Sequence, residues 1–309
     1  MTDVLSDKAA GPRKTLTGSS AAADDHSEGM SYLESIPRQL VTLYLPLSIF
    51  LIILLFPFYW MALTAIKPNE QLLDMERVSP FWTWSPTFQH IRKLLFESNY
   101  PLWLWNTMYV AAAATALSIF ASVLAAYAIV RLRFKGAQTI GGLIFLAYLV
   151  PPSILFIPLS TVIYNYGLFD SPLALILVYP TILIPFSTWL LMGYFKTIPY
   201  ELEESARLDG CTTWQAFWKL IFPLLAPMNA TVGIFAFLQS WNDFMMPSLI
   251  TADSTLQTLP VLQNIFQTQF SSNYNVAFAS YLMAMAPAII VYLFTQLWVM
   301  AGVTQGAIK

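Results

Sequence analysis

The sequence predicts an all-α integral membrane protein with about six transmembrane helices. Of its 309 residues, 57% are hydrophobic and only 10% are charged, whereas soluble domains average about 25% charged residues. Water cannot solvate a whole surface of this composition, so much of it must face lipid. Six apolar stretches follow one another along the chain, and helices are expected because they pair their own backbone N–H and C=O groups inside a bilayer.

Residues 1–36 precede these stretches and differ from them in composition. They mix small, polar and charged residues and lack the apolar core of about 7–15 residues that marks a secretory signal. Such a segment cannot bury enough apolar surface to fold. We therefore expect a disordered tail over 1–36 and a six-helix membrane domain over 37–309.

Each apolar stretch is long enough for the about 20 residues that cross a hydrocarbon core of about 30 Å. Within these stretches Asp243, near the end of the fifth, is the only Asp, Glu, Lys, Arg or His. Ion-coupled transporters usually keep such groups in their spans, so this interior favours an uncharged polar solute. The predicted spans are 40–66, 102–130, 140–164, 172–195, 224–250 and 276–300.

Lysine and arginine are distributed unevenly between the two sides of the predicted bundle. One side holds eleven of them and the other holds four, all in the first loop. Because short cytoplasmic loops carry an excess of these residues, the side with eleven should be cytoplasmic. The second loop is the main support, since Arg131, Arg133 and Lys135 lie there without an acid. Both termini, including the 1–36 tail, should then be cytoplasmic.

The sequence carries no signature of catalysis. His26 and His90 are far apart, and neither an HExxH nor a GxxxxGK[ST] motif is present. The single cysteine, Cys211, excludes an intrachain disulfide, and no basic stripe suggests nucleic acid as a partner. We expect no catalytic residue, no metal site and no cofactor bound by this chain. Any ATP would be bound by another chain.

The fourth loop, at 197–223, is predicted to form two short helices with a sharp corner between them. Pro199 suits a first helical turn, and the glutamates that follow it suit a helix N-terminus. Gly210 suits the position at which a helix ends, and Thr212 with Gln215 fits a capping box. Several apolar side chains on this cytoplasmic elbow need burial against the spans or a partner.

The same elbow resembles the EAA loop of permeases from ABC importers. That loop has the pattern E-A-A-x-x-D-G-A, followed by an aromatic residue and then L-P-x-x-x-P. This chain departs at Ser205 and Cys211, both small for small, and at Phe222 in place of leucine. The matching residues, which the resemblance assigns to ATPase coupling, are Glu204, Ser205, Ala206, Asp209, Gly210, Cys211 and Phe217.

Other segments resemble the carbohydrate, maltose-permease-like branch of these importers and extend the likeness over nearly the whole chain after residue 40. They are Asn106-Thr107 at the start of the second span, Tyr127-Ala128 with Arg131, Arg133 and Phe134 at its end, Trp241-Asn242-Asp243-Phe244 in the fifth, and Ala301-Gly302-Val303-Thr304 near the end of the chain.

The resemblance implies a type I ABC importer permease in a bacterial or archaeal cytoplasmic (inner) membrane. It implies a second homologous permease, two ATPase subunits that bind ATP and magnesium, and an external solute-binding protein. It also implies alternating access and a sugar cargo, either a di- or oligosaccharide or a related polyol or glycerol phosphate. The competing interpretations are a non-transporting scaffold or receptor, and a channel or facilitator.

Three groups of residues keep two interpretations each. Asn106 either joins two helices or contacts the solute. Trp241 and Asn242 either anchor a helix end at the membrane interface or line the substrate path. The outer loop around 251–275 is either an inert connector or, as the resemblance implies, a contact for the binding protein through Ser254, Thr255, Leu256 and Gln257.

Overall fold

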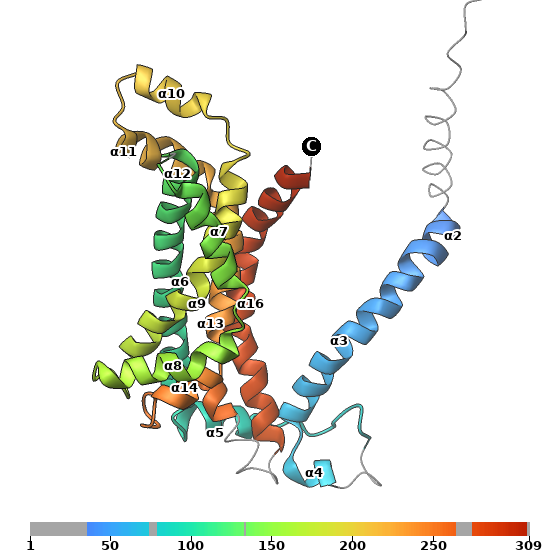
Figure 1. Cartoon of the computed structure of the whole chain (residues 1–309). Coiled ribbons are helices and arrows are strands. Elements are labelled where there is room, and N and C mark those ends of the chain that lie inside the picture. Colours follow the sequence, from blue (N-terminus) through green and yellow to red (C-terminus); the bar gives the residue numbers. More distant parts are fainter. Residues whose placement is uncertain (1–35, 74–78, 133, 264–273, 308–309) are drawn as a thin grey trace, which may run out of the picture. The chain divides into compact units, whose positions relative to one another are not determined.

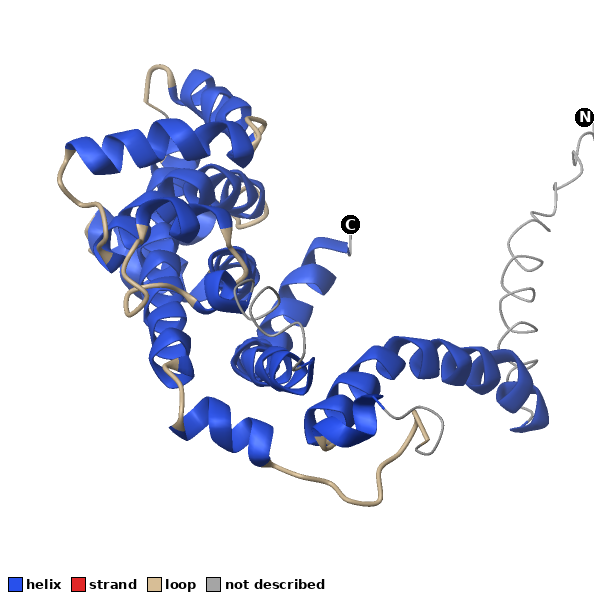
Figure 2. Ribbon diagram, turned by 90° about the horizontal axis from the view of Figure 1, so that it is seen from below, coloured by secondary structure: helices blue, strands red, loops and turns tan. Residues whose placement is uncertain are grey.

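The computed structural model describes residues 36–73, 79–132, 134–263 and 274–307. Within these ranges the chain forms helices, turns and loops, and no described residue lies in a strand (Figure 2). The chain divides into two compact units, 1–59 and 60–309, and each is described by itself. The predicted tail lies outside the described residues, except for Ile36 at the start of α2 (Ile36–Gln39).

The described part of the first unit is a single apolar helical segment. After α2 it continues as a π-helical turn, η1 (Leu40–Tyr44), and as α3 (Leu45–Ile66), whose last residues belong to the second unit. Every side chain from 40 to 59 is exposed. An apolar helix whose side chains are exposed along this length suits contact with lipid or with another membrane chain.

The second unit contains the remaining helices. These are α4 (Asn69–Leu73), α5 (Gln89–Phe96), α6 (Tyr100–Arg131), α7 (Ala137–Tyr148), α8 (Pro152–Asn165), α9 (Pro172–Phe195), α10 (Glu201–Leu208), α11 (Thr213–Ala216), the π-helical η2 (Phe217–Ile221), α12 (Phe222–Leu224), α13 (Ala226–Trp241), α14 (Met245–Ile250) and α16 (Tyr274–Ala307).

Four helices are long and apolar enough to cross a membrane unbroken: Leu40–Ile66, α6, α9 and the Tyr274–Met300 part of α16. Two bent pairs bring the number to six. The first pair, α7 and α8, bends by 97°, and the second, Thr213–Leu224 with α13, bends by 71°. The predicted fold class is thereby confirmed, with two of the six spans broken.

Local chemistry explains why two predicted spans are interrupted. The 140–164 stretch breaks at Leu149–Pro151, where Pro151 and Pro152 lack the N–H groups that would continue the helix. The 71° bend of the second pair lies at Leu225, and the 224–250 stretch breaks again after Trp241. There Asn242 Nδ2 donates to the Leu238 carbonyl at 2.9 Å, and Asp243 Oδ1 accepts from the Met245 N–H at 3.1 Å. Such side-chain bonds compete with helix continuation.

Helix α6 is the centre of the second unit and packs against α9 and α13, while α13 also packs against α16. Its buried small residues recur every three or four positions, which lets the neighbouring backbones approach closely. They are Ala111, Ala114, Ser118, Ser122 and Ala126. In Figure 1, α10 to α12 lie at one end of α6 and α9, and α5 and α14 lie at the other.

Candidate functional site

The elbow forms as two short helices around a glycine corner. Helix α10 begins at Glu201 with three acids in its first turn, where the helix dipole favours them. Pro199 precedes the helix by two residues, so its predicted place in the first turn is wrong. At the other end Gly210 has a φ of +86°, which costs glycine little. There the Cys211 N–H bonds the Ala206 carbonyl at 2.9 Å.

The second helix begins with the predicted capping box. The Gln215 N–H donates to Thr212 Oγ1 at 3.2 Å, and the Thr212 N–H donates to Gln215 Oε1 at 2.9 Å. Phe217 is buried against Tyr127 of α6, with ring centroids 4.8 Å apart. The elbow is therefore folded by its own hydrogen bonds and packed on the bundle through an aromatic contact.

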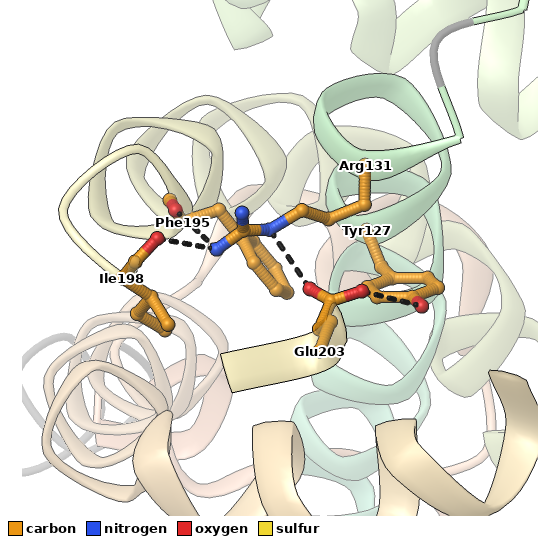
Figure 3. Close-up of polar contacts among 5 residues, drawn as sticks. All are labelled: Tyr127, Arg131, Phe195, Ile198 and Glu203. Carbon is orange, nitrogen blue, oxygen red and sulfur yellow. Dashed lines mark hydrogen bonds and ion pairs between the residues drawn. The ribbon is translucent and has the colours of Figure 1, made fainter. Parts of the chain in front are cut away.

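A buried ion pair ties α10 to the end of α6 (Figure 3). Arg131 Nε lies 3.1 Å from Glu203 Oε1, with 7% and 1% of the two side chains exposed. The Tyr127 hydroxyl donates to Glu203 Oε2 at 3.2 Å. Arg131 Nη2 also donates to the carbonyls of Phe195 and Ile198, at 3.0 and 2.6 Å. One guanidinium thus joins the end of α6, the end of α9 and the start of α10.

The opposite side of the elbow is exposed and partly apolar. Leu208 is 89% exposed and Trp214 is 60% exposed. An apolar tip of this kind on a rigid loop is typical of a protein contact. Of the residues predicted to couple to an ATPase, Glu204, Ser205, Asp209 and Gly210 are exposed, Ala206 and Cys211 are half-buried, and Phe217 is buried.

The three residues predicted for the substrate path are in different surroundings. Asn106 is buried, and its Nδ2 donates to the carbonyls of Thr255 and Gln257 at 2.8 and 3.1 Å. It therefore holds the loop that contains Thr255 and Gln257. Trp241 is also buried and stacks on Phe237 with centroids 5.3 Å apart. Only Asn242 is exposed.

The loop that contains residues 254–257 is held at several points. The Trp103 indole N–H donates to the Ser254 carbonyl at 2.7 Å, and Thr107 Oγ1 accepts from the Leu259 N–H at 2.8 Å. Asp170 has a φ of +59°, and its Oδ1 accepts from the N–H groups of Ala252 and Asp253, both at 2.9 Å. The loop is thus fixed from beneath, while the side chains of Ser254 and Thr255 are exposed and those of Leu256 and Gln257 are half-buried.

Hydrogen bonds from Thr255 lower the pKa of the exposed Asp253 carboxyl. The carboxylate accepts from the Thr255 N–H and hydroxyl, both at 2.8 Å. The loop therefore carries a stable negative charge beside the residues predicted to contact the binding protein.

A second buried polar cluster joins the end of α3 to α5 and α16. The His90 Nε2 lies 3.1 Å from the Lys67 carbonyl oxygen, which can only accept, and Asn275 Nδ2 donates to the same oxygen. The Lys67 ammonium donates to the carbonyls of Ser79 and Pro80 at 2.8 and 3.0 Å. Burial is the main reason that the pKa of His90 is lowered, and it also lowers the pKa of Lys67.

Sequence analysis missed the Arg131–Glu203 pair and the Lys67–His90–Asn275 cluster. The sequence predicted Arg131 only as a basic residue of a cytoplasmic loop, within a segment that resembles the carbohydrate branch. The available signal was its place at the end of an apolar span, where a charge needs a partner. The structure describes no group of three or more His, Cys, Asp and Glu residues suited to a metal ion.

Comparison with known proteins identifies the family. The family model described as "Binding-protein-dependent transport system inner membrane component" matches residues 118–305. The sulfoquinovosyl glycerol transport system permease protein SmoH of Agrobacterium fabrum is 34% identical over 86% of this chain and 93% of its own. The diacetylchitobiose uptake system permease protein DasC of Streptomyces coelicolor is 31% identical over 83% of this chain and 92% of its own.

A solved structure shares the fold. A chain of a bacterial ABC transporter that imports the acidic polysaccharide alginate superposes with a TM-score of 0.71 and 20% sequence identity, over 89% of this chain and 98% of the other. The family model covers more than half of the chain, and the expected resemblance is confirmed. This chain belongs to the family of inner-membrane permease components of binding-protein-dependent ABC transport systems.

Proposed function

We propose that this chain is one of two homologous permease subunits in an ATP-driven sugar importer, and that its 197–223 elbow docks on an ATPase subunit. The observation that carries the proposal is the two-sided character of the elbow. Its inner side is tied to α6 and α9 through Arg131 and Glu203. Its outer side presents the exposed side chains of Leu208 and Trp214.

Such an arrangement suits the transfer of motion between subunits. A force applied at the exposed tip of α10 passes through a buried ion pair and two carbonyl bonds into two long spans. Packed helices respond to such a force by moving as semi-rigid bodies. Closure of two ATPase subunits, which bind ATP and magnesium, would thereby switch the bundle between inward-open and outward-open states.

The cargo class rests on the relatives and on the interior. SmoH and DasC are named as permeases for sulfoquinovosyl glycerol and diacetylchitobiose. The spans of this chain offer amides, hydroxyls and aromatic rings with little charge. A di- or oligosaccharide, or a related polyol or glycerol phosphate, fits both. An external solute-binding protein would deliver it and contact the fixed 254–257 loop. The 254–257 loop faces the outside only if both termini are cytoplasmic.

Cross-linking in the assembled complex tests the docking. A Leu208→Cys variant on a Cys211→Ser background should form a cross-link to a co-purifying ATPase. A Ser254→Cys variant, whose exposed cysteine lies beside Trp103 near the start of α6, at the opposite end of that helix from Arg131, should not. Cross-linking of neither variant in an intact, ATP-hydrolysing complex would refute the docking site.

Uptake measurements test the cargo. Cells that express the complete transporter should accumulate at least one of radiolabelled maltose, trehalose and diacetylchitobiose in an ATP-dependent way. Equilibration without accumulation would instead indicate a facilitator, and absence of any uptake would remove these sugars as cargo. No specific observation favours a scaffold or receptor.

A further inference from the structure

A cavity of about 310 Å³ lies where the break between α7 and α8 meets α9 and α13. Its volume falls within the about 300–1,000 Å³ that is usual for small-molecule sites. None of its lining side chains is charged at neutral pH. Its aromatic and polar lining includes Tyr148, Thr181, Phe186, Phe235 and Gln239.

Counting along the helices places this cavity near the middle of the membrane. Thr181 and Phe186 come 9 and 14 residues after Pro172, the first residue of α9, or about 14 and 21 Å at a rise of 1.5 Å per residue. Tyr148 comes 11 residues after the start of α7 on the opposite side, or about 16 Å. The hydrocarbon core is about 30 Å thick, so both counts end near its centre.

The broken helix shows that this depth is not lipid. Pro152 has no N–H, so the Tyr148 carbonyl loses its helical donor, and Leu149 and Val150 are exposed beside it. Non-helical backbone at membrane depth occurs only where it is buried in protein or lines a water-filled cavity. The exposed break therefore faces water or another protein chain in the assembled transporter.

The side chains around the break combine flat apolar rings with amides. The Tyr148 and Phe186 rings lie 5.1 Å apart between centroids, and the Phe186 and Phe235 rings 5.9 Å apart. Phe235 and Gln239 also line a second cavity of about 290 Å³, together with Asn242 and Asp243. Phe235, Gln239 and Asn242 are all exposed, and their spacing of four and three residues puts them on one face of α13.

We propose that this surface, made by Tyr148, Phe186, Phe235, Gln239 and Asn242, is where the permease contacts its sugar during translocation. The rings offer flat apolar area for the C–H face of a pyranose. The two amides offer donors and acceptors for its hydroxyl groups. This assignment rests on the proposed function and moves the substrate path away from Asn106 and Trp241, whose side chains are buried elsewhere.

Cysteine accessibility tests whether the surface faces water. Gln239→Cys, on a Cys211→Ser background in the complete transporter, should react with a small charged methanethiosulfonate. Leu293→Cys, an exposed position on α16 that lines neither cavity, should react slowly, as a lipid-facing residue does. A slow reaction at Gln239→Cys in every state of the ATPase cycle would overturn the proposal.

Uptake tests the sugar contact itself. Gln239→Leu keeps the size of the side chain but removes the amide, so the KM for whichever of the three labelled disaccharides the wild type accumulates should rise about tenfold, as for the loss of a polar pairing. Gln296→Leu in α16 is the matched control and should leave KM unchanged. An unchanged KM for Gln239→Leu would overturn the sugar contact.

The two proposals fail in different ways. A wild-type transporter that accumulates none of the three sugars contradicts the proposed cargo, and the accessibility result still decides whether this surface is part of a water-filled path.

Discussion

Removing one partner of the Arg131–Glu203 pair should release the elbow from the bundle. Both side chains are less than 10% exposed, so Arg131→Met leaves a buried carboxylate with only the Tyr127 hydroxyl. Breaking a buried pair from one side costs about 3–5 kcal/mol. At 1.4 kcal/mol per factor of ten, the equilibrium constant for local opening of α10 should rise by about a hundredfold or more.

Glu203→Gln should have a smaller effect than Arg131→Met. It leaves Arg131 able to donate to the carbonyls of Phe195 and Ile198 and keeps an oxygen for the tyrosine. The double variant Arg131→Met/Glu203→Leu should recover part of the loss, because an apolar replacement of a buried ion pair leaves no charge unpaired. It cannot recover the two carbonyl bonds.

Hydrogen–deuterium exchange of the α10 amides in the assembled complex measures this opening directly. Lys219→Met is the control, since its side chain is exposed on η2 and an ordinary surface substitution changes stability by about 0.5 kcal/mol or less. The coupled ATPase rate should fall in parallel with increased exchange. Exchange in both single variants within about twofold of the wild type, the size of a surface effect, would refute the reasoning.

Four further predictions follow from the same geometry. Gly210→Val should abolish coupled ATP hydrolysis without preventing membrane insertion, because the φ of +86° is strained for a β-branched residue. Gly210→Asn should retain most of the activity, because asparagine tolerates this region of φ. Equal activity of the two variants would contradict the role of the Gly210 corner in coupling. A cysteine at Ser254 should react with an impermeant reagent outside intact cells and one at Ser19 should not, on a cysteine-free background, and the reverse pattern would overturn the orientation. Asn106→Leu leaves two loop carbonyls without a donor, at about 1–3 kcal/mol, so it should weaken ATPase stimulation by the binding protein but not basal turnover. The pKa of His90 is lowered in the folded chain, so the unfolded chain binds more protons. The stability advantage of wild type over His90→Gln should therefore shrink as pH falls below about 6.5. Thermal unfolding of the two proteins in detergent at pH 5.5 and 7.5 measures this difference, and a pH-independent difference would rule out the linkage.

Local sequence signals predicted those parts of the fold that local chemistry determines. The capping box at Thr212 and the corner at Gly210 form from residues within a few positions of one another. The broken spans were not predicted, because prolines alone do not mark a break. Pro180 and Pro185 lie inside the continuous α9. At Pro151 and Pro152 two consecutive donors are lost, and no neighbouring turn carries the helix past them.

The residues of the elbow show the same difference between what local sequence determines and what long-range packing determines. Three glutamates stand in the first turn of α10, and the pattern of the loop singles out Glu204, which is exposed and free to meet another subunit. Which glutamate is buried depends on the position of Arg131, which lies on another helix and far away in the sequence. A buried carboxylate needs a charged or hydrogen-bonding partner, so the fold places Glu203 where the guanidinium that also holds the end of α9 can reach it. Adjacent glutamates thus take different positions: Glu203 holds the elbow to the spans, whereas Glu204 is exposed where the proposed ATPase contact would lie. Only the long-range packing of α6 on α9 decides between them.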